Sequence, residues 1–268
     1  MNGKVWLIGG TSDSVEIAKI LVVNRIPFVV SVATQAAKDI YLADTQVVIG
    51  YMNLEQMQSF CQRENIQQVI DASHPYATEV SQSAIAITAK LDIAYLRYER
   101  SNYQAANSTQ TNSSIIELDS FDTLLAGNYF QGQRVLLTVG CKILPQFQSW
   151  QKRATLYARV LPKLESLNIA QKAGFTSDRI VAIRPPLTIE LETALWQQWQ
   201  ISLVVTKASG TAGGEDIKRQ VAADLNIPLI IIARPQMDYP QQITDLQKIV
   251  ALCQSNNCMG ERPFAPNN

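Results

Sequence analysis

The sequence predicts an α/β protein with two doubly wound domains built on mainly parallel sheets. Short apolar runs alternate with segments of helical periodicity along residues 4–98. The same alternation resumes at residue 134 and continues to residue 253. Because parallel strands need a crossover connection, usually a helix, this alternation is typical of βαβ units.

Three segments follow from this pattern. We expect an N-terminal domain over residues 1–100, a C-terminal α/β domain over residues 101–253, and a disordered tail over residues 254–268. Residues 101–114 are polar and lack periodicity, so they predict a linker or a surface excursion.

The composition excludes several classes of protein. The chain has 268 residues, 47% of them apolar, which suffices for packed cores. Its 23 basic and 23 acidic side chains cancel, so binding to nucleic acid by bulk electrostatics is not expected. No apolar run approaches the ~20 residues of a membrane span, and the N-terminus lacks a signal-peptide layout.

The cysteines and the histidine indicate a cytoplasmic protein without a metal. Cys61, Cys141, Cys253 and Cys258 show no paired CxxC spacing, so reduced thiols are the simplest account. A metal-binding cluster of histidine and cysteine is not expected, because the chain has one histidine.

The first strand and the turn after it are typical of a dinucleotide-binding unit. The apolar run of residues 5–8 ends in Gly9 and Gly10, which let the backbone turn sharply and approach a ligand. Thr11 and Ser12 favour a helix start, where unpaired N–H groups attract phosphate. The full glycine fingerprint is absent, so a tight turn without a ligand is the alternative.

The end of the second predicted strand carries no acidic residue. Residues 27–33 form that strand, and the stretch from Ser31 to Ala37 lacks the carboxylate that holds the ribose 2′-hydroxyl of NAD. Lys38 follows, and an ordinary surface lysine is its simplest interpretation. This stretch favours NADP over NAD.

The fourth predicted strand runs directly into Ser73, His74 and Pro75. The carboxyl ends of parallel strands share one edge of a sheet, where ligands bind, so this segment should lie beside Gly9 and Gly10. A lone histidine is usually structural or merely exposed. His74 follows a buried strand at the ligand edge and precedes a proline that restricts the turn, so we favour a site role for it.

Seven short motifs occur in order along the chain: Gly9-Gly10-Thr11, Asp71-Ala72-Ser73-His74-Pro75-Tyr76-Ala77, Arg97-Tyr98-Glu99-Arg100, Thr138-Val139-Gly140, Ala158-Arg159-Val160-Leu161-Pro162, Thr206-Lys207-Ala208-Ser209-Gly210 and Ala233-Arg234-Pro235. Together they resemble the precorrin-6A reductase family of cobalamin biosynthesis, over residues 4–252. The resemblance implies two Rossmann-like domains with NADPH and substrate in the cleft between them. It also implies reduction of precorrin-6A, or its cobalt form, to precorrin-6B.

Three positions depart from the family pattern. The first turn carries Asp13 where the family often has glutamate. Residues 33–35 lack the arginine that often follows the second strand, so no residue is assigned to the 2′-phosphate. Cys141 precedes Lys142 where the family commonly has a basic residue directly after the glycine.

The substrate implied by the resemblance is an acidic, tetrapyrrole-derived ring, and neighbouring enzymes of the cobalamin pathway are the expected partners for product transfer. Arginine and lysine bind carboxylates, arginine in two-point geometry. The substrate-binding candidates are Arg97, Arg100, Lys142, Arg159, Ser209, Gly210 and Arg234. For each of the cations, a structural ion pair is the alternative.

The cofactor-binding candidates gather at the ends of the first, second and fourth predicted strands. They are Gly9, Gly10, Thr11, Ser12, Ser31, Ser73, His74 and Pro75. The catalytic candidates are His74 and Lys207. Lys207 ends a buried strand before a glycine-rich loop, residues 208–214, which we expect to be flexible and to expose N–H groups. A lysine there can bind an anion or stabilise charge during hydride transfer.

Other kinds of protein could carry the same glycine turn. A short-chain dehydrogenase needs a Tyr-x-x-x-Lys pair, and none of the nine tyrosines has one. A redox-sensing regulator would bind NADP without turnover, and a different NADP-dependent reductase would act on another polycarboxylate.

The end of the second strand has no acidic residue, and the resemblance to precorrin-6A reductases implies NADPH. Both predict tighter binding of NADPH than of NADH. Titrating the protein with each cofactor, followed by fluorescence, measures the two dissociation constants. Equal or tighter binding of NADH would contradict the prediction.

Overall fold

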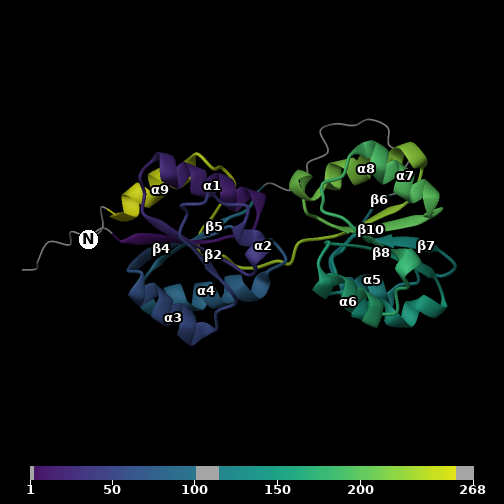
Figure 1. Cartoon of the computed structure of the whole chain (residues 1–268), viewed down its shortest axis with the longest axis horizontal. Helices are drawn as coiled ribbons and strands as arrows, with labels where there is room; N and C mark the ends of the chain where they lie inside the picture. Colours follow the sequence, from purple (N-terminus) through teal and green to yellow (C-terminus); the bar gives the residue numbers. More distant parts are fainter. Residues whose placement is uncertain (1–2, 101–114, 258–268) are drawn as a thin grey trace, which may run out of the picture. The chain divides into compact units, whose positions relative to one another are not determined.

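The chain folds into two units, each with its own parallel sheet, in a computed structural model that describes residues 3–100 and 115–257 (Figure 1). Unit 1 contains the described residues of Met1–Arg100 and Gln236–Asn268, and unit 2 those of Ser101–Pro235. The predicted linker, residues 101–114, and residues 258–268 of the predicted tail lie outside the described residues. Two Rossmann-like units are present, as the sequence predicts.

Unit 1 is built on a six-stranded sheet in the order β12-β5-β4-β1-β2-β3. Every strand pair recorded in it is parallel. The strands are β1 (Lys4–Ile8), β2 (Phe28–Val32), β3 (Val47–Ile49), β4 (Ile66–Asp71), β5 (Ala94–Tyr98) and β12 (Gln242–Ile243). The inner strands read as continuous apolar runs because both faces of the sheet are covered.

Helices cover both faces of this sheet. They are α1 (Ser12–Val23), α2 (Gln35–Lys38), α3 (Leu54–Arg63), α4 (Thr78–Leu91) and α9 (Lys248–Asn257). Figure 1 shows α1 and α9 on one face and α3 and α4 on the other. One apolar core therefore contains Leu21 and Ile249, and a second contains Trp6 and Phe60.

Unit 2 repeats this architecture with a sheet in the order β6-β11-β10-β7-β8-β9, again with parallel pairs. The strands are β6 (Ile115–Leu118), β7 (Arg134–Leu137), β8 (Thr155–Val160), β9 (Ile180–Ala182), β10 (Leu203–Lys207) and β11 (Leu229–Ile232). The inner strands β7, β10 and β11 are apolar and buried, like those of unit 1.

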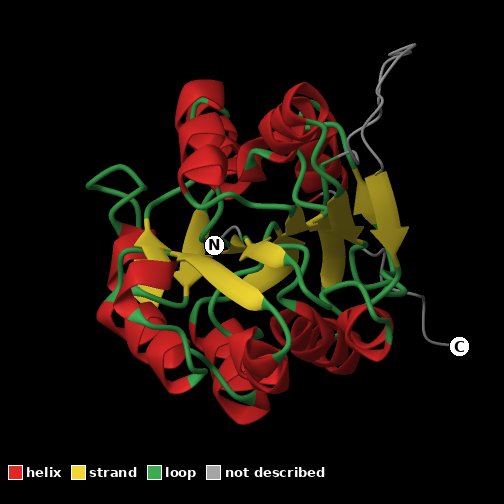
Figure 2. Cartoon of the chain, turned by 90° about the vertical axis from the view of Figure 1, so that its right-hand side faces the viewer, coloured by secondary structure: helices red, strands yellow, loops and turns green. Residues whose placement is uncertain are grey.

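The helices of unit 2 also form two layers, seen in red on either side of the yellow strands in Figure 2. They are α5 (Phe121–Ala126), η1 (Leu144–Lys152), α6 (Leu164–Lys172), η2 (Ser177–Arg179), α7 (Ile189–Gln198), η3 (Thr211–Gly213) and α8 (Glu215–Leu225). Phe147 lies in the core beneath α5 and α6, and Trp196 in the core beneath α7 and α8. Among the described residues, no helix is long and apolar enough to cross a membrane.

The structure corrects the expected end of the second domain. We expected residues 236–253 to belong to the C-terminal domain, but the chain returns to unit 1 at Gln236. The N–H groups of Arg97 and Glu99 donate to the carbonyls of Gln241 and Ile243, at 2.8 and 2.9 Å, which adds β12 to the first sheet. A local apolar pattern predicts an element, but it does not say which sheet the element joins.

Several elements escaped prediction for local reasons. The short elements α2, α5, β6 and β12 have too few residues to show a period. The longer helix α7 buries only Glu192 and Trp196, so it lacks an apolar stripe. The last helix, α9, runs from Lys248 to Asn257.

Each sheet has a point at which its connections reverse direction. In unit 1 it lies between β1 and β4, and in unit 2 between β7 and β10. Ligands of doubly wound sheets bind outside the carboxyl ends of the strands at this point. The segments that follow these four strands are therefore the candidate ligand-binding segments.

The position of α9 predicts that Ile249→Ala destabilises unit 1. The Ile249 side chain is fully buried in the core shared with α1, so its truncation should lower the free energy of unfolding by ~2–5 kcal/mol. Calorimetry of the full chain resolves the effect, with the exposed neighbour Lys248→Ala as control. An unchanged unfolding profile would contradict the packing of α9.

Candidate functional site

The turn after β1 is shaped by a tyrosine that the sequence analysis did not single out. Tyr41 is buried, and its hydroxyl fills the place where a side chain on Gly9 would stand. The N–H of Gly9 donates to the carbonyl of Ser31 at 2.9 Å. Only glycine fits at this position because the hydroxyl of the buried Tyr41 would lie 2.2 Å from a Cβ there.

Ser14 and Tyr41 bind the N–H groups that the turn presents. The N–H of Gly10 lies 3.1 Å from the Ser14 Oγ and 2.9 Å from the Tyr41 Oη, and the N–H of Thr11 lies 3.1 Å from the same Ser14 Oγ. Burial raises the pKa of Tyr41, which keeps the hydroxyl protonated. Two of the amides expected to meet phosphate are therefore engaged inside the turn.

The start of α1 keeps the features of an anion site. Gly10 has φ +100°, a conformation that suits glycine, and only the Ala37 Cβ lies within 4 Å of where its own Cβ would stand. Thr11 caps α1 by accepting the N–H of Ser14. The N–H groups of the first turn, including those of Ser12 and Asp13, have no acceptor within the helix. Ser12 is exposed there.

Ser31 lies inside the unit, at the end of β2. Its side chain is buried, and its Oγ accepts the indole N–H of Trp6 at 2.8 Å. The structure thus gives this cofactor-binding candidate an internal partner. Lys38, at the end of α2, is exposed.

A fully buried carboxylate organises the segment after β4. Asp71 is 0% exposed. Its Oδ1 accepts from the Arg97 guanidinium at 3.0 Å and from the N–H of Ser73 at 2.9 Å. Its Oδ2 accepts from the hydroxyls of Ser81 and Tyr95, at 2.5 and 2.7 Å. These four donors compensate the loss of hydration of the carboxylate.

This arrangement fixes the backbone from which the histidine projects. Ser73 and Pro75 are buried, whereas His74 is exposed, and its Nδ1 accepts the N–H of Tyr76 at 3.3 Å. The hydroxyl of Thr11 donates to the carbonyl of Ala72 at 2.8 Å. The segment after β4 therefore lies beside the turn after β1, as the sequence predicts.

The two arginines expected to bind substrate in unit 1 have carboxylate partners. Arg97 is 1% exposed and pairs with Asp71 and with Glu99, at 3.0 and 3.1 Å. Its guanidinium also lies over the ring of Tyr239, from the returning segment. Arg100 is partly exposed and pairs with Asp13 at 3.3 Å. Arg97 is an internal organiser of the unit, whereas Arg100 lies near the start of α1.

The segments after β6, β7 and β10 meet around Lys207 in unit 2. Its ammonium lies 5.6 Å from the ring centre of Phe121, the first residue of α5. Burial lowers the pKa of Lys207 to about 8; the nearby Cys141 raises it and the cationic Lys142 lowers it. Lys142 itself is exposed. Lys207 and Lys142 therefore lie at one edge of the sheet.

The remaining basic candidates of unit 2 bind groups of their own unit. Arg159 is buried and pairs with Glu192 on α7, whose other oxygen accepts the indole N–H of Trp196 at 3.0 Å. Arg234 donates through Nε to the carbonyl of Ala208 at 2.8 Å. Arg159 thus joins a buried ion pair, and Arg234 holds the start of the loop after β10.

The loop after β10 is held more firmly than expected. The N–H of Gly210 donates to the carboxylate of Glu215 at 2.9 Å. The N–H groups of Gly213 and Gly214 donate to carbonyls within the loop. Lys218 donates to two further carbonyls of the same loop. These amides are not available to an anion, because acceptors of unit 2 already occupy them.

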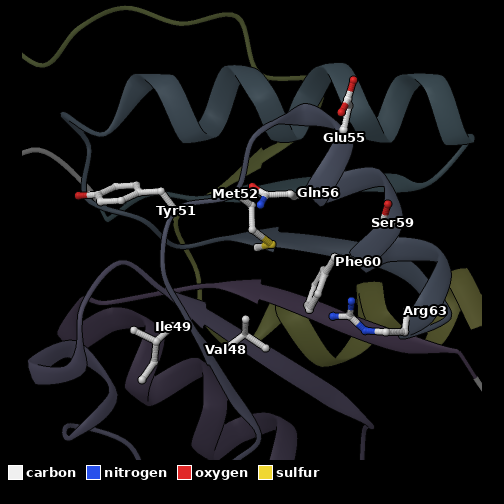
Figure 3. A pocket seen from close by; sticks show the side chains of 9 residues that line it. All are labelled: Val48, Ile49, Tyr51, Met52, Glu55, Gln56, Ser59, Phe60 and Arg63. Atoms are coloured by element: carbon white, nitrogen blue, oxygen red, sulfur yellow. The ribbon is translucent and has the colours of Figure 1, made fainter.

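A separate pocket of about 470 Å³ lies at the β3 edge of unit 1 (Figure 3). It runs between the end of β3 and one side of α3, with Tyr51 and Arg63 at its opposite ends. Its lining residues are Val48, Ile49, Tyr51, Met52, Glu55, Gln56, Ser59, Phe60 and Arg63. None of them follows β1 or β4, so the pocket contains no residue of the predicted site.

The chain matches the family model described as precorrin-6x reductase CbiJ/CobK over residues 4–254. The chain belongs to this family. It is accordingly an oxidoreductase of cobalamin biosynthesis, which implies a nicotinamide cofactor. The family expected from the seven motifs is confirmed.

Relatives and a solved structure agree with this assignment. A cobalt-precorrin-6A reductase from Synechocystis is 44% identical, over 93% of this chain and 95% of the relative. One from Salmonella typhimurium is 35% identical over 87% and 88%. The structure of a CobK precorrin-6A reductase matches with a TM-score of 0.77 at 24% identity, over 95% of this chain and 97% of that one, which supports the fold.

The turn after β1 has an open outer side. The space beside Gly10 is open apart from Ala37, and the first-turn amides of Ser12 and Asp13 lie next to it. The Asp13 carboxylate would repel a phosphate, but Arg100 pairs with it. The hydroxyl of Thr11 donates to the carbonyl of Ala72, which brings the segment of the exposed His74 to the same edge of unit 1.

The sequence did not predict the residues that hold the backbone of the candidate site in place. Ser14, Tyr41, Asp71, Glu215 and Lys218 each bind backbone groups of a predicted segment. Asp71 begins one of the seven motifs, which was a usable signal. The other four carry no local pattern, because their partners depend on tertiary packing.

The buried pair predicts that Asp71→Ala strongly destabilises unit 1. Removing the carboxylate leaves Arg97 without its closest buried partner, at a cost of ~3–5 kcal/mol in the free energy of unfolding. Denaturant unfolding measures it, with the exposed Asp39→Ala as control.

The double variant Asp71→Ala/Arg97→Met removes both charges, so it should lose less stability than Asp71→Ala and Arg97→Met lose in sum. Additive losses would show that the pair contributes no coupling.

Proposed function

We propose that this chain reduces cobalt-precorrin-6A, or the cobalt-free ring, to the corresponding precorrin-6B with NADPH as hydride donor. The 44% identity to a cobalt-precorrin-6A reductase, across nearly the whole of both chains, carries the proposal. The relatives from Synechocystis and Salmonella named above favour the cobalt form. We also propose a cytoplasmic location and product transfer to neighbouring pathway enzymes.

Unit 1 is the proposed cofactor-binding unit. The Gly10 turn and the first-turn amides of α1 would bind the pyrophosphate, and the segment carrying His74 would orient the nicotinamide. NADPH supplies the hydride that forms one new C–H bond at the reduced double bond, and a proton completes the other. The end of β2, Ser31–Val32 and the residues after it, has no carboxylate to repel a 2′-phosphate.

Unit 2 is the proposed substrate-binding unit. Lys207 ends β10 and Lys142 lies in the segment that follows β7, where cations can bind the carboxylates of the ring. The pKa of Lys207 near 8 leaves the ammonium protonated at neutral pH and able to stabilise negative charge that develops during hydride addition. Ser209 and Arg234 belong to the adjoining loop and strand end.

Incubating the protein with cobalt-precorrin-6A and NADPH tests the proposal. Loss of the NADPH absorbance, together with a product heavier by two hydrogen atoms, is the expected result. NADPH binding without oxidation would overturn the reductase assignment and favour a redox sensor. A parallel reaction with cobalt-free precorrin-6A identifies the preferred ring.

The position of Lys207 predicts that Lys207→Ala lowers kcat/KM at least about tenfold without loss of fold. In the wild type, kcat/KM should fall as pH rises through about 8, because Lys207 loses its proton there, and the variant should lack this decline. The exposed Lys172→Ala is the matched control. Wild-type turnover from folded Lys207→Ala would remove Lys207 from the site.

A further inference from the structure

Lys218 is a fully buried lysine that the proposed reaction does not use directly. It lies on the second turn of α8 and is 1% exposed. Its ammonium donates to the carbonyls of Gly213 and Gly214, at 2.7 and 2.9 Å. A lysine is almost never buried in this way unless it is paired, so the two carbonyls are its principal compensation.

Glu215 holds the other end of the same loop. Its Oε2 accepts the N–H of Gly210 at 2.9 Å, and its Oε1 accepts from Arg219 at 3.0 Å. Gly210 has φ +65° and Gly214 has φ +67°, positive values that favour glycine. An isolated loop with two such glycines would have many alternative conformations, so its single shape needs external hydrogen bonds.

The surroundings of Lys218 are charged and closely packed. Burial lowers the pKa of Lys218 to about 7; the charge of Arg159 lowers it further, while the charges of Glu192, Glu215 and Asp216 raise it. A Cβ on Gly214 would lie 3.6 Å from the Lys218 ammonium and 3.5 Å from Pro186. The ammonium therefore fills a defined space between α8, the loop and the segment after β9.

We propose that Lys218 and Glu215 are positioning residues, which hold residues 208–214 by their main chain so that the loop presents Lys207 and Ser209 in one arrangement. The loop begins directly after Lys207, whose carbonyl accepts the N–H of Ser209 at 2.7 Å. The hydrogen bonds that Lys218 and Glu215 make to the loop go to its backbone groups. This inference rests on the proposed role of Lys207 in the reduction.

Two pairs of variants separate positioning from simple stability. Lys218→Met removes the donors, whereas Lys218→Gln keeps a shorter one. Glu215→Met removes the acceptor for Gly210, whereas Glu215→Gln keeps it. The exposed Gln220→Met on the same helix is the control. All are measured in the full chain.

Hydrogen exchange gives a readout that does not depend on activity. In Lys218→Met the amides of residues 208–214 should exchange at least about tenfold faster, while those of β7 and β8 keep their protection. Lys218→Gln should show a smaller change. Unchanged exchange in the loop, or equal acceleration throughout unit 2, would overturn the positioning role.

Turnover measurements on variants of Lys218 and Lys207 test the same inference. Lys218→Met should lower kcat about tenfold with NADPH affinity unchanged, and adding it to Lys207→Ala should cause little further loss, because the two act as one group. Independent, multiplicative losses would overturn the inference. Failure of the proposed function would appear separately, as no turnover by the wild type.

Discussion

The buried ion pair between Asp71 and Arg97 is the constraint on which the candidate site of unit 1 depends. A carboxylate without water must keep its donors, and one of the four donors to Asp71 is the backbone N–H of Ser73. Displacing the segment after β4 would therefore leave the buried carboxylate without one of its four donors. The contact of Thr11 with Ala72 extends this constraint to the glycine turn.

In unit 2, buried charged side chains also hold a backbone segment in place. Glu215 accepts a backbone N–H, and Lys218 donates to backbone carbonyls, so buried charges hold the loop after β10. In both units the side chains that hold the backbone are buried, while His74 and Lys207 are more accessible. Such preorganisation lowers the reorganisation needed when charge develops in a reaction.

The candidate site could be predicted where function follows from position along a strand. Lys207 and His74 lie at strand ends, as their sequence context indicates. Arg97 and Arg159 also lie in strands near such ends, but the fully buried carboxylates that pair with them, Asp71 and Glu192, are 26 and 33 residues away in the chain. No local pattern reveals these pairs, so the two arginines could not be separated from cations that face a ligand.

The sequence by itself determined the α/β class with two parallel sheets and the family, because apolar runs, helical periods and motifs are local properties of the chain. Only the tertiary structure decided that the chain returns to the first sheet at Gln236, that Tyr41 requires Gly9, and that buried charges hold both loops. These features depend on which distant residues share a buried space. Desolvation then makes their hydrogen bonds obligatory.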